Sequence, residues 1–174
     1  MPSHTRRDTN RALEQGLKDR TYDLVFELGE SRGMFPLPNE SCLRVGSAPL
    51  CAVFPTVHTL AKKKSVTWDL LKPERIITYD QSMGDQAARP ETVLAGNRNL
   101  PDVEMLLVSV AMGLGITVLP AFMEGRLADM SMLTFVPISG DGNMLDILAR
   151  WREDNLSPLC QTLIQSLKNF ISEV

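Results

Sequence analysis

The sequence predicts an α/β protein, and three observations lead to that prediction. Stretches rich in β-branched and aliphatic residues, typical of buried strands, alternate with stretches that have the apolar spacing of amphipathic helices. This alternation favours helices packed on largely parallel sheets. The composition, 44 % hydrophobic and 22 % charged in 174 residues, is typical of a globular chain of one domain or two small lobes. The third observation is a long uncharged run.

That run is MLLVSVAMGLGITVLPAFM, residues 105–123. It approaches the roughly 20 apolar residues that a membrane-spanning helix needs. Gly113, Gly115 and Pro120 interrupt it, however, and glycine followed by proline is how helices of water-soluble proteins end. No cluster of Lys or Arg flanks the run, as a topology signal would require. It therefore predicts a buried helix, a turn and the short strand ITVL rather than a membrane span.

The first half of the chain begins with an amphipathic pattern, for which Asp8 is the expected N-cap. The elements expected in this half are, in order, a helix over 8–20, a buried strand over 22–28, a Gly- and Pro-rich loop to about 41, two short strand segments within 43–55, a surface excursion over 57–66, one helical turn ended by Pro73 and a strand over 75–80.

The second half repeats the alternation. The elements expected here are a helix opening within 81–88, a strand over 92–96, the helix and strand of the uncharged run, two strands over 132–138 and 144–151 separated by the turn SGDGN, and a last helix from Ser157. Pro158 takes the first position of that helix, which favours its start there. Its apolar residues at helical spacing line one face: Leu159, Leu163, Leu167 and Phe170.

Charge and cysteine content exclude some classes of protein. The net charge of −3 and the isoelectric point near 5.4 argue against nucleic-acid binding through a basic face. The basic stretches TRRDTNR and Lys62–Lys64 are expected to be solvated. Cys42, Cys51 and Cys160 are widely spaced and form no metal-binding pair, which favours buried free thiols. The polar N-terminus has no apolar h-region, so we expect no signal peptide and a cytoplasmic protein.

The sequence contains no catalytic or metal-binding constellation. His4 and His58 are the only histidines, and no GxSxG motif is present. His58 follows a predicted strand, where a structural role is favoured over a catalytic one. No cluster of His, Cys or carboxylates has the spacing of metal ligands, and the glycines of GLGITVLP follow a helix, the wrong order for dinucleotide binding. We therefore expect no enzyme, no cofactor and no metal.

Five stretches in a fixed order resemble the effector-binding, or substrate-binding, domain of LysR-type transcriptional regulators. They are KDRTYDLVFEL, VFPTVHTLAKK, DLLKPERII, LLVSVAMGLGITVLP and LSPLCQTLIQSLKNFI, and the resemblance spans residues 10–172. The fourth stretch is the strongest match, to a family pattern ending in G-x-G-I-x-x-L-P. Arg20, Thr59 and Met112 stand where the family usually has glycine, proline and a small residue.

The resemblance implies a two-lobed fold of the type II periplasmic-binding-protein kind, with a small effector bound in the cleft between two α/β lobes. The first lobe would comprise 1–54 and 118–174, and the second 55–117. The chain begins after the family's first strand, first helix and second strand. We therefore expect an incomplete first lobe with an unpaired sheet edge, and hypothesise a truncated product that compensates by self-association or rearrangement.

Open α/β sheets bind ligands at the carboxyl ends of their strands and at helix N-termini. This geometry selects nine candidate effector-binding residues, and the resemblance implies effector contacts around the same positions. The candidates are Thr9, Asn10, Glu27, Gly29, Tyr79, Gln81, Ser82, Asn99 and Pro120. The alternative for each is ordinary loop or capping chemistry, which favours the same residue types. Arg98 is the nearest cation for a carboxylate effector, although a solvated role is favoured.

The function that the resemblance implies is effector sensing by a regulator. A small molecule, with carboxylates among the candidates, would shift the lobes or the oligomer and so signal to a DNA-binding domain. No helix-turn-helix pattern is present, so DNA contact is expected only through a domain outside this chain. A homo-oligomer without membrane contact is expected. The alternatives are a solute-binding protein of the same fold, which would require export, and a non-functional truncated remnant.

Overall fold

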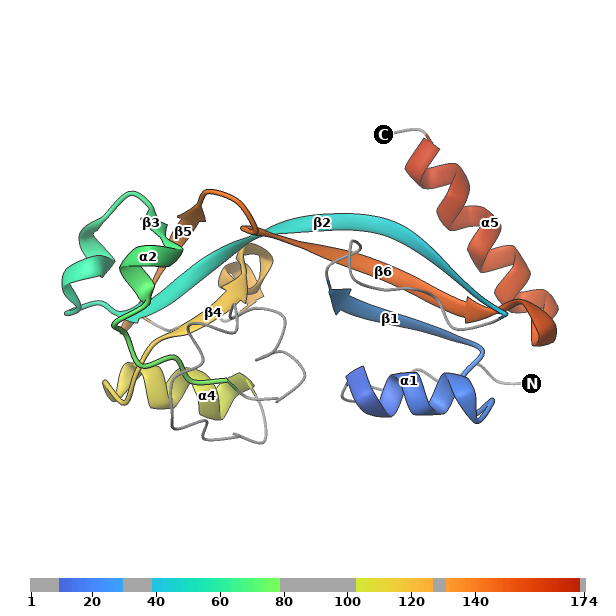
Figure 1. Cartoon of the computed structure of the whole chain (residues 1–174), viewed down its shortest axis with the longest axis horizontal. Helices are drawn as coiled ribbons and strands as arrows, with labels where there is room; N and C mark the ends of the chain where they lie inside the picture. Colours follow the sequence, from blue (N-terminus) through green and yellow to red (C-terminus); the bar gives the residue numbers. More distant parts are fainter. Residues whose placement is uncertain (1–9, 30–38, 79–102, 127–130, 173–174) are drawn as a thin grey trace. The chain divides into compact units, whose positions relative to one another are not determined.

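Figure 1 shows the computed structural model of the chain, in which the described residues are 10–29, 39–78, 103–126 and 131–172. The chain divides into two compact units, of which the first comprises 1–47 with 146–174 and the second comprises 48–145. The lobe boundaries expected from the sequence stay a prediction. The helix and strand expected within 81–88 and over 92–96 lie outside the described residues.

The first unit is a sheet with a helix on each face (Figure 1). Its elements are α1 (Asn10–Lys18), β1 (Leu24–Gly29), the start of β2 (Glu40–Pro55), most of β6 (Met144–Arg152), the short 3-10 helix η3 (Glu153–Asn155) and α5 (Pro158–Ser172). β1 pairs antiparallel with β6, and β6 neighbours β2, so the strand order here is β1-β6-β2.

The end of α1 explains one departure from the family pattern. Arg20, where glycine is usual, has φ +62°, and the N–H of Thr21 donates to Gly16 O at 2.8 Å. This left-handed geometry after a helix is the one for which glycine is preferred. Gly16 is required by close packing, because a Cβ there would lie 2.2 Å from the ring of Tyr22. Leu17 is fully buried and anchors the helix.

The other face of this sheet packs against α5. Ala149 and Trp151 of β6 form a core with Ile164, and the partly buried residues around them are Leu24, Leu43, Val45, Leu156 and Leu167. The helix begins where Pro158 predicted it. Of the four residues predicted to line one of its faces, only Leu167 belongs to this core. The exposed ones are Leu159, Leu163 and Phe170.

The second unit is built around the later part of β2. Its elements are η1 (Thr59–Lys62), β3 (Val66–Thr67), α2 (Trp68–Leu71), α4 (Val103–Ala111), β4 (Thr117–Pro120), η2 (Ala121–Arg126) and β5 (Leu133–Ser139). β2 pairs antiparallel with β4 and with β5, whereas β3 pairs with β5 in parallel. One cluster of its buried core contains Val53, Ile77, Leu106, Leu107 and Leu119.

Two details of the predicted strands are wrong. β2 is one strand of 16 residues rather than two segments. Pro49 has no N–H to donate, but it does not interrupt the strand. Its side chain is exposed, and the hydrogen bond to the neighbouring turn comes from the next residue, where the N–H of Leu50 donates to Asn143 O at 2.7 Å.

The pairing of the described strands is mostly antiparallel rather than parallel, since the long strands β2 and β6 pair with strands running the opposite way. Alternation of helices and strands does not reveal such pairing.

The uncharged run forms the predicted helix, turn and strand. α4 ends at Ala111, Gly113 takes φ +74°, and β4 begins at Thr117. Ile116 forms a parallel bridge with Ile76, with Ile77 N–H donating to Ile116 O at 2.8 Å. In the described parts of the chain, every helix is too short or too polar to cross a membrane.

The cysteines are free, but they differ in exposure. Cys51 is buried in the middle of β2, as expected. Cys42 is exposed, and Cys160 is intermediate. The prediction of buried thiols is therefore wrong for Cys42, because alternate residues at the start of β2 reach solvent.

Candidate functional site

The structure describes only part of the predicted effector site. The residues that lie outside the described ranges are Thr9, Tyr79, Gln81, Ser82, Arg98 and Asn99. Asn10 is the first residue of α1, as its predicted place at a helix start requires. Glu27 and Gly29 lie on β1 in the first unit, and Pro120 ends β4 in the second. Effector binding by these residues stays a prediction.

Glu27 belongs to a buried network centred on Arg150. Arg150 Nη1 donates to Glu27 Oε1 at 2.9 Å, and Nη2 donates to Glu40 Oε2 at 2.6 Å. The side chains of Glu27, Glu40 and Arg150 are 1 %, 0 % and 7 % exposed. Burial by itself would lower the pKa of Arg150, but hydrogen bonds to Glu40 and Glu27 outweigh it and raise that pKa. The guanidinium therefore stays charged.

The network ties three strands of the first unit together. Glu27 comes from β1, Glu40 from β2 and Arg150 from β6. Removing one partner of such a buried group leaves an uncompensated charge, so the network depends on all three side chains. The bond to Arg150 fixes the side chain of Glu27 near the end of β1, where Gly29 is buried two residues later.

Sequence reasoning selected Glu27 but missed Arg150 and Glu40. A signal was present, because Arg150 follows the apolar run Ile147–Ala149 and precedes Trp151, and a charge inside a predicted buried strand needs a partner. No comparable signal pointed to Glu40, because it lies in a stretch that was predicted to be a loop.

Thr78 is a further candidate that the sequence analysis did not select. It follows the bridge between Ile76 and Ile116, and it is 9 % exposed. Its Oγ1 is buried and makes no hydrogen bond in the described structure. A buried hydroxyl without a partner is unfavourable, and this one lies at the carboxyl end of a parallel pair, where ligands of α/β folds bind. Its place immediately after the stretch RII was the available signal.

His58 has the structural role that the sequence favoured. Its Nδ1 accepts a hydrogen bond from the N–H of Leu60 at 3.2 Å and caps η1. Its ring stacks on Phe54 at a centroid distance of 5.0 Å, and Nε2 lies 3.4 Å from Glu74 Oε2.

The first unit has a shallow groove of about 210 Å³, lined by Arg44, Val45, Gly46, Ser47, Phe170 and Ile171. Ligand pockets commonly measure roughly 300–1,000 Å³, so this groove is small for an effector. Its cation, Arg44, has Nη1 3.7 Å from Asp146 Oδ1. Of the predicted effector-binding residues that the structure describes, none lines this groove.

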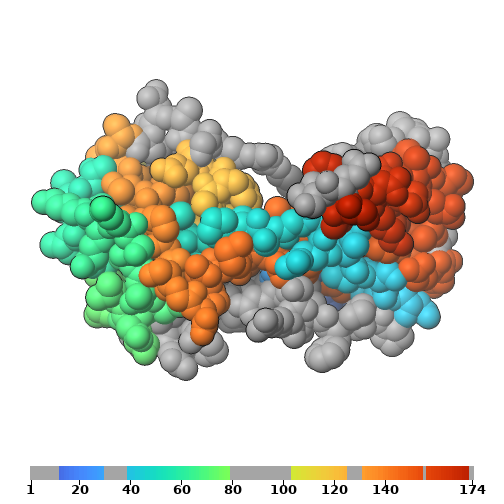
Figure 2. All heavy atoms as spheres, turned by 90° about the horizontal axis from the view of Figure 1, so that it is seen from above, coloured from blue at the N-terminus to red at the C-terminus, as the bar shows by residue number. Residues whose placement is uncertain are grey.

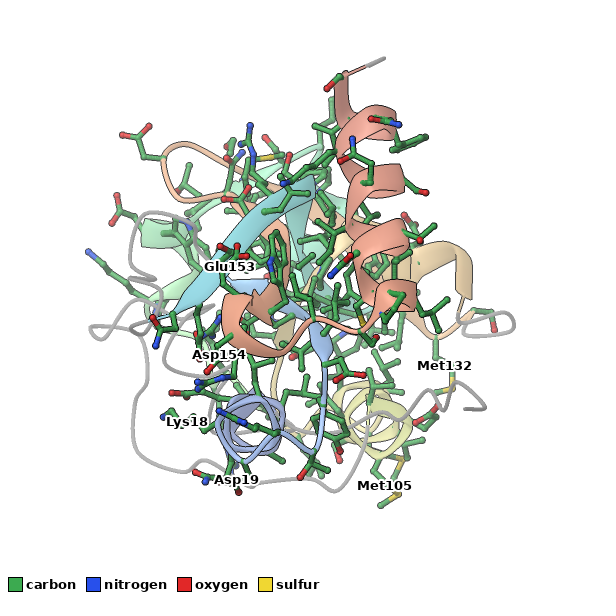
Figure 3. All side chains as sticks on the ribbon, turned by 90° about the vertical axis from the view of Figure 1, so that its right-hand side faces the viewer. Lys18, Asp19, Met105, Met132, Glu153 and Asp154 are labelled. Carbon is green, nitrogen blue, oxygen red and sulfur yellow. The ribbon has the colours of Figure 1, made fainter. Side chains whose placement is uncertain are left out.

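Charged side chains at the end of β6 pair with one another at the surface. Asp154 accepts hydrogen bonds from Arg152 at 2.6 and 2.9 Å and from Arg20 at 3.3 Å. Figure 3 shows Asp154 on the side of η3 that faces the end of α1, where Lys18 is labelled. The bond from Arg152 lowers the pKa of Asp154. Such exposed ion pairs contribute little to stability. Because both arginines are paired with Asp154, they are not available to bind an anionic ligand. Among the described residues, no group of His, Cys, Asp and Glu could hold a metal ion.

Comparison with protein families finds one match over nearly the whole chain. The family model described as the LysR substrate binding domain matches residues 4–171. The Hca operon transcriptional activator HcaR of Escherichia coli (strain K12) is 23 % identical over 157 residues, covering 86 % of this chain and 52 % of HcaR. The chain thus spans about half the length of this curated relative.

Solved structures show the same fold. The effector binding domain of a BenM variant has a TM-score of 0.75 at 19 % identity, with 94 % of this chain and 78 % of that chain covered. BenM with its effector benzoate gives 0.69 at 18 %, covering 94 % and 76 %. The Synechocystis PCC6803 CcmR regulatory domain in complex with 2-PG gives 0.72 at 18 %, covering 92 % and 78 %. These proteins are named as regulators or effector-binding domains, and none is named as an enzyme.

Proposed function

Because this chain belongs to the LysR substrate-binding domain family, we propose that it is the effector-binding part of a transcriptional regulator. It binds a small molecule and biases the arrangement of a DNA-binding domain outside these residues. The family match over 4–171 is the observation that carries the proposal. Such signalling requires the effector to bind one arrangement of the protein more tightly than another. Binding rather than catalysis, and a cytoplasmic location beside the DNA, follow from this role.

The effector is a small carboxylate. BenM, a structural neighbour, is described with its effector benzoate. The predicted residues suit such a ligand, because the hydroxyl of Thr9, the amide of Asn10 and the phenol of Tyr79 can each donate a hydrogen bond to a carboxylate. Thr78 joins these residues as a candidate donor on the strength of its unpaired buried hydroxyl.

A thermal-shift screen of the purified chain tests this proposal. Benzoate and a panel of aliphatic and aromatic carboxylates are compared with the matched neutral amides, such as benzamide. A ligand that binds only the folded protein raises its melting temperature, by a few degrees at concentrations well above Kd. We expect stabilisation by a carboxylate and none by its amide. Equal stabilisation by both would contradict the carboxylate class, and no stabilisation by any compound would contradict effector binding by this chain.

We also propose that the chain forms a homo-oligomer. Apolar side chains that are 40 % exposed or more are found on α4 and α5, and large exposed apolar patches mark interaction surfaces. Light scattering across a concentration series tests this point independently of any effector.

A further inference from the structure

The segment that links β2 to β3 carries a local excess of positive charge. Its three lysines, Lys62–Lys64, are exposed, and Figure 2 shows the segment, turquoise to green in that view, at the surface of the second unit. Residues 57–75 contain five Lys or Arg and two Asp or Glu, a net charge of +3, whereas the whole chain has −3 and the remaining residues therefore have −6. Among the described residues, none forms an ion pair with these lysines. Their charge is therefore free to attract an anionic partner.

Contacts with the rest of the second unit hold the backbone of this segment in place. At its start, the N–H of Thr56 donates to Met132 O at 2.9 Å. His58 accepts the N–H of Leu60 at 3.2 Å, and its ring stacks on the buried ring of Phe54. At its other end the segment continues into β3, which pairs with β5. A surface that is ordered before it binds loses less conformational entropy on binding than a flexible one does.

The same segment presents an apolar side chain to solvent. Val57 is 89 % exposed, more than any other large apolar side chain in the described part of the chain. A single exposed apolar residue is common and by itself indicates no partner. Protein interfaces, however, combine apolar contact with a polar and charged rim. A segment that carries both Val57 and three lysines therefore suits a polypeptide that has acidic and apolar side chains.

We propose that Val57 and Lys62–Lys64, together called the basic surface, bind an acidic segment of another protein. Asp or Glu carboxylates of that segment pair with the lysines, and an apolar side chain of the segment contacts Val57. Complementary charge of this kind steers the encounter and selects the partner. The basic surface contains none of the candidate effector-binding residues, so this inference does not depend on the proposed effector.

Duplex DNA is the competing partner, and the charges of the chain disfavour it. Three lysines neutralise about three phosphates, and the affinity gained from so few contacts is lost quickly as the salt concentration rises. The net charge of −6 on the remaining residues also repels a long polyanion more strongly than a short acidic segment, which meets the basic surface alone. Phosphate contacts, moreover, give Val57 no apolar partner.

Fluorescence anisotropy tests the inference with a labelled peptide in which glutamates surround one leucine, titrated with the full chain at low ionic strength. A variant that combines Lys62→Glu, Lys63→Glu and Lys64→Glu should raise the dissociation constant at least about tenfold, because attraction is replaced by repulsion. The matched control combines Lys18→Glu, Arg44→Glu and Lys168→Glu, which change the net charge of the chain equally but lie in the first unit. It should bind the peptide at least about threefold more tightly than the lysine variant does. Circular dichroism melting curves show whether each variant is folded, and replacing the three lysines with glutamine serves as a milder second variant.

The apolar contact has its own test. Val57→Ser should weaken binding of the leucine-containing peptide severalfold but leave unchanged the binding of a peptide with serine in place of leucine, whereas Leu70→Ser, at an exposed apolar position of α2, should affect neither. Three results would overturn the inference: no binding of the peptide at low ionic strength, equal losses in the lysine variant and its charge-matched control, or tighter binding of duplex DNA than of the peptide. A lysine variant that no longer binds the peptide but is still stabilised by a carboxylate separates this inference from the effector proposal.

Discussion

Arg150 Nη2 lies 2.6 Å from Glu40 Oε2, and both side chains are buried in the first unit. The same guanidinium reaches Glu27 with its other nitrogen, at 2.9 Å. One cation therefore satisfies carboxylates from two strands that lie on either side of its own strand β6. Buried charges of this kind hold strands in register only while every partner is present.

Replacing Arg150 with Leu should strongly destabilise the protein. The change leaves Glu27 and Glu40 buried without their cation, and breaking a buried ion pair costs about 3–5 kcal/mol. Urea unfolding measures the loss of free energy of unfolding. Arg44→Leu is the matched control, because Arg44 is 64 % exposed and its pair with Asp146 spans 3.7 Å, so the loss should stay below about 1 kcal/mol. Equal effects of the two changes would show that the network around Arg150 adds nothing to stability.

Glycine at position 115 should be indispensable for packing. A Cβ there would lie 2.5 Å from Arg75 O, the atom that accepts the N–H of Ile116 at 2.8 Å, and 2.8 Å from a side-chain carbon of Ile77. Gly115→Ala must therefore displace backbone, and we expect a loss of roughly 2–3 kcal/mol. In Gly46→Ala the nearest atom is 3.9 Å away, so that control should be neutral or slightly stabilising. Thermal or urea unfolding of both variants gives the comparison, and a neutral Gly115→Ala would contradict this account.

Arg20→Gly should stabilise the protein. Arg20 has φ +62°, a conformation that costs a side-chain-bearing residue about 1 kcal/mol and glycine much less. The exposed contact of Arg20 with Asp154, at 3.3 Å, is lost, but it contributes little. The net gain should be roughly 0.5–1 kcal/mol, visible as a rise of a few degrees in melting temperature. Arg20→Ala keeps the strain and removes the contact, so it should give no gain. A destabilised Arg20→Gly would mean that the ion pair outweighs the backbone strain.

Elements were predictable where local chemistry determines them. Pro158 marked the start of α5, and the glycines at 113 and 115 marked the end of α4. The packing face of α5 was not predictable, because the helix has two adjacent apolar stripes and only the tertiary fold decides that Ile164 faces the sheet. The network around Arg150 likewise depends on the pairing of strands distant in sequence, which no local pattern reveals. Thr78 could be recognised only once its hydroxyl was seen to be buried.

Cys51 should react far more slowly than Cys42 with iodoacetamide. Burial, assisted by the negative charge of Glu124, raises the pKa of Cys51, so the reactive thiolate is scarce at neutral pH. Burial also raises the pKa of Cys42, but that side chain is exposed and accessible. Both rates should increase as the pH rises, because the thiolate fraction grows until the pH passes the raised pKa. Mass spectrometry of alkylated peptides measures the alkylation rate of each cysteine. The chain unfolded in guanidinium is the reference, in which both cysteines should react at the same rate. Modification of Cys51 as fast as Cys42 in the native protein would disprove the predicted protection.

Thr78→Val should separate effector binding from stability. The substitution keeps the shape of the side chain and removes a buried hydroxyl that has no hydrogen-bond partner in the described structure, so folding stability should be unchanged or slightly higher. If that hydroxyl donates to the carboxylate effector, its loss removes a hydrogen bond to a charged group, worth about 1.5–3 kcal/mol, and affinity should fall roughly 10- to 100-fold. Calorimetric titration with the carboxylate that stabilises the wild type measures the change. Thr134→Val, at a half-buried position of β5, is the control and should bind normally. Unchanged affinity in Thr78→Val would remove Thr78 from the site, and lost stability would mean that its hydroxyl is paired within the protein itself.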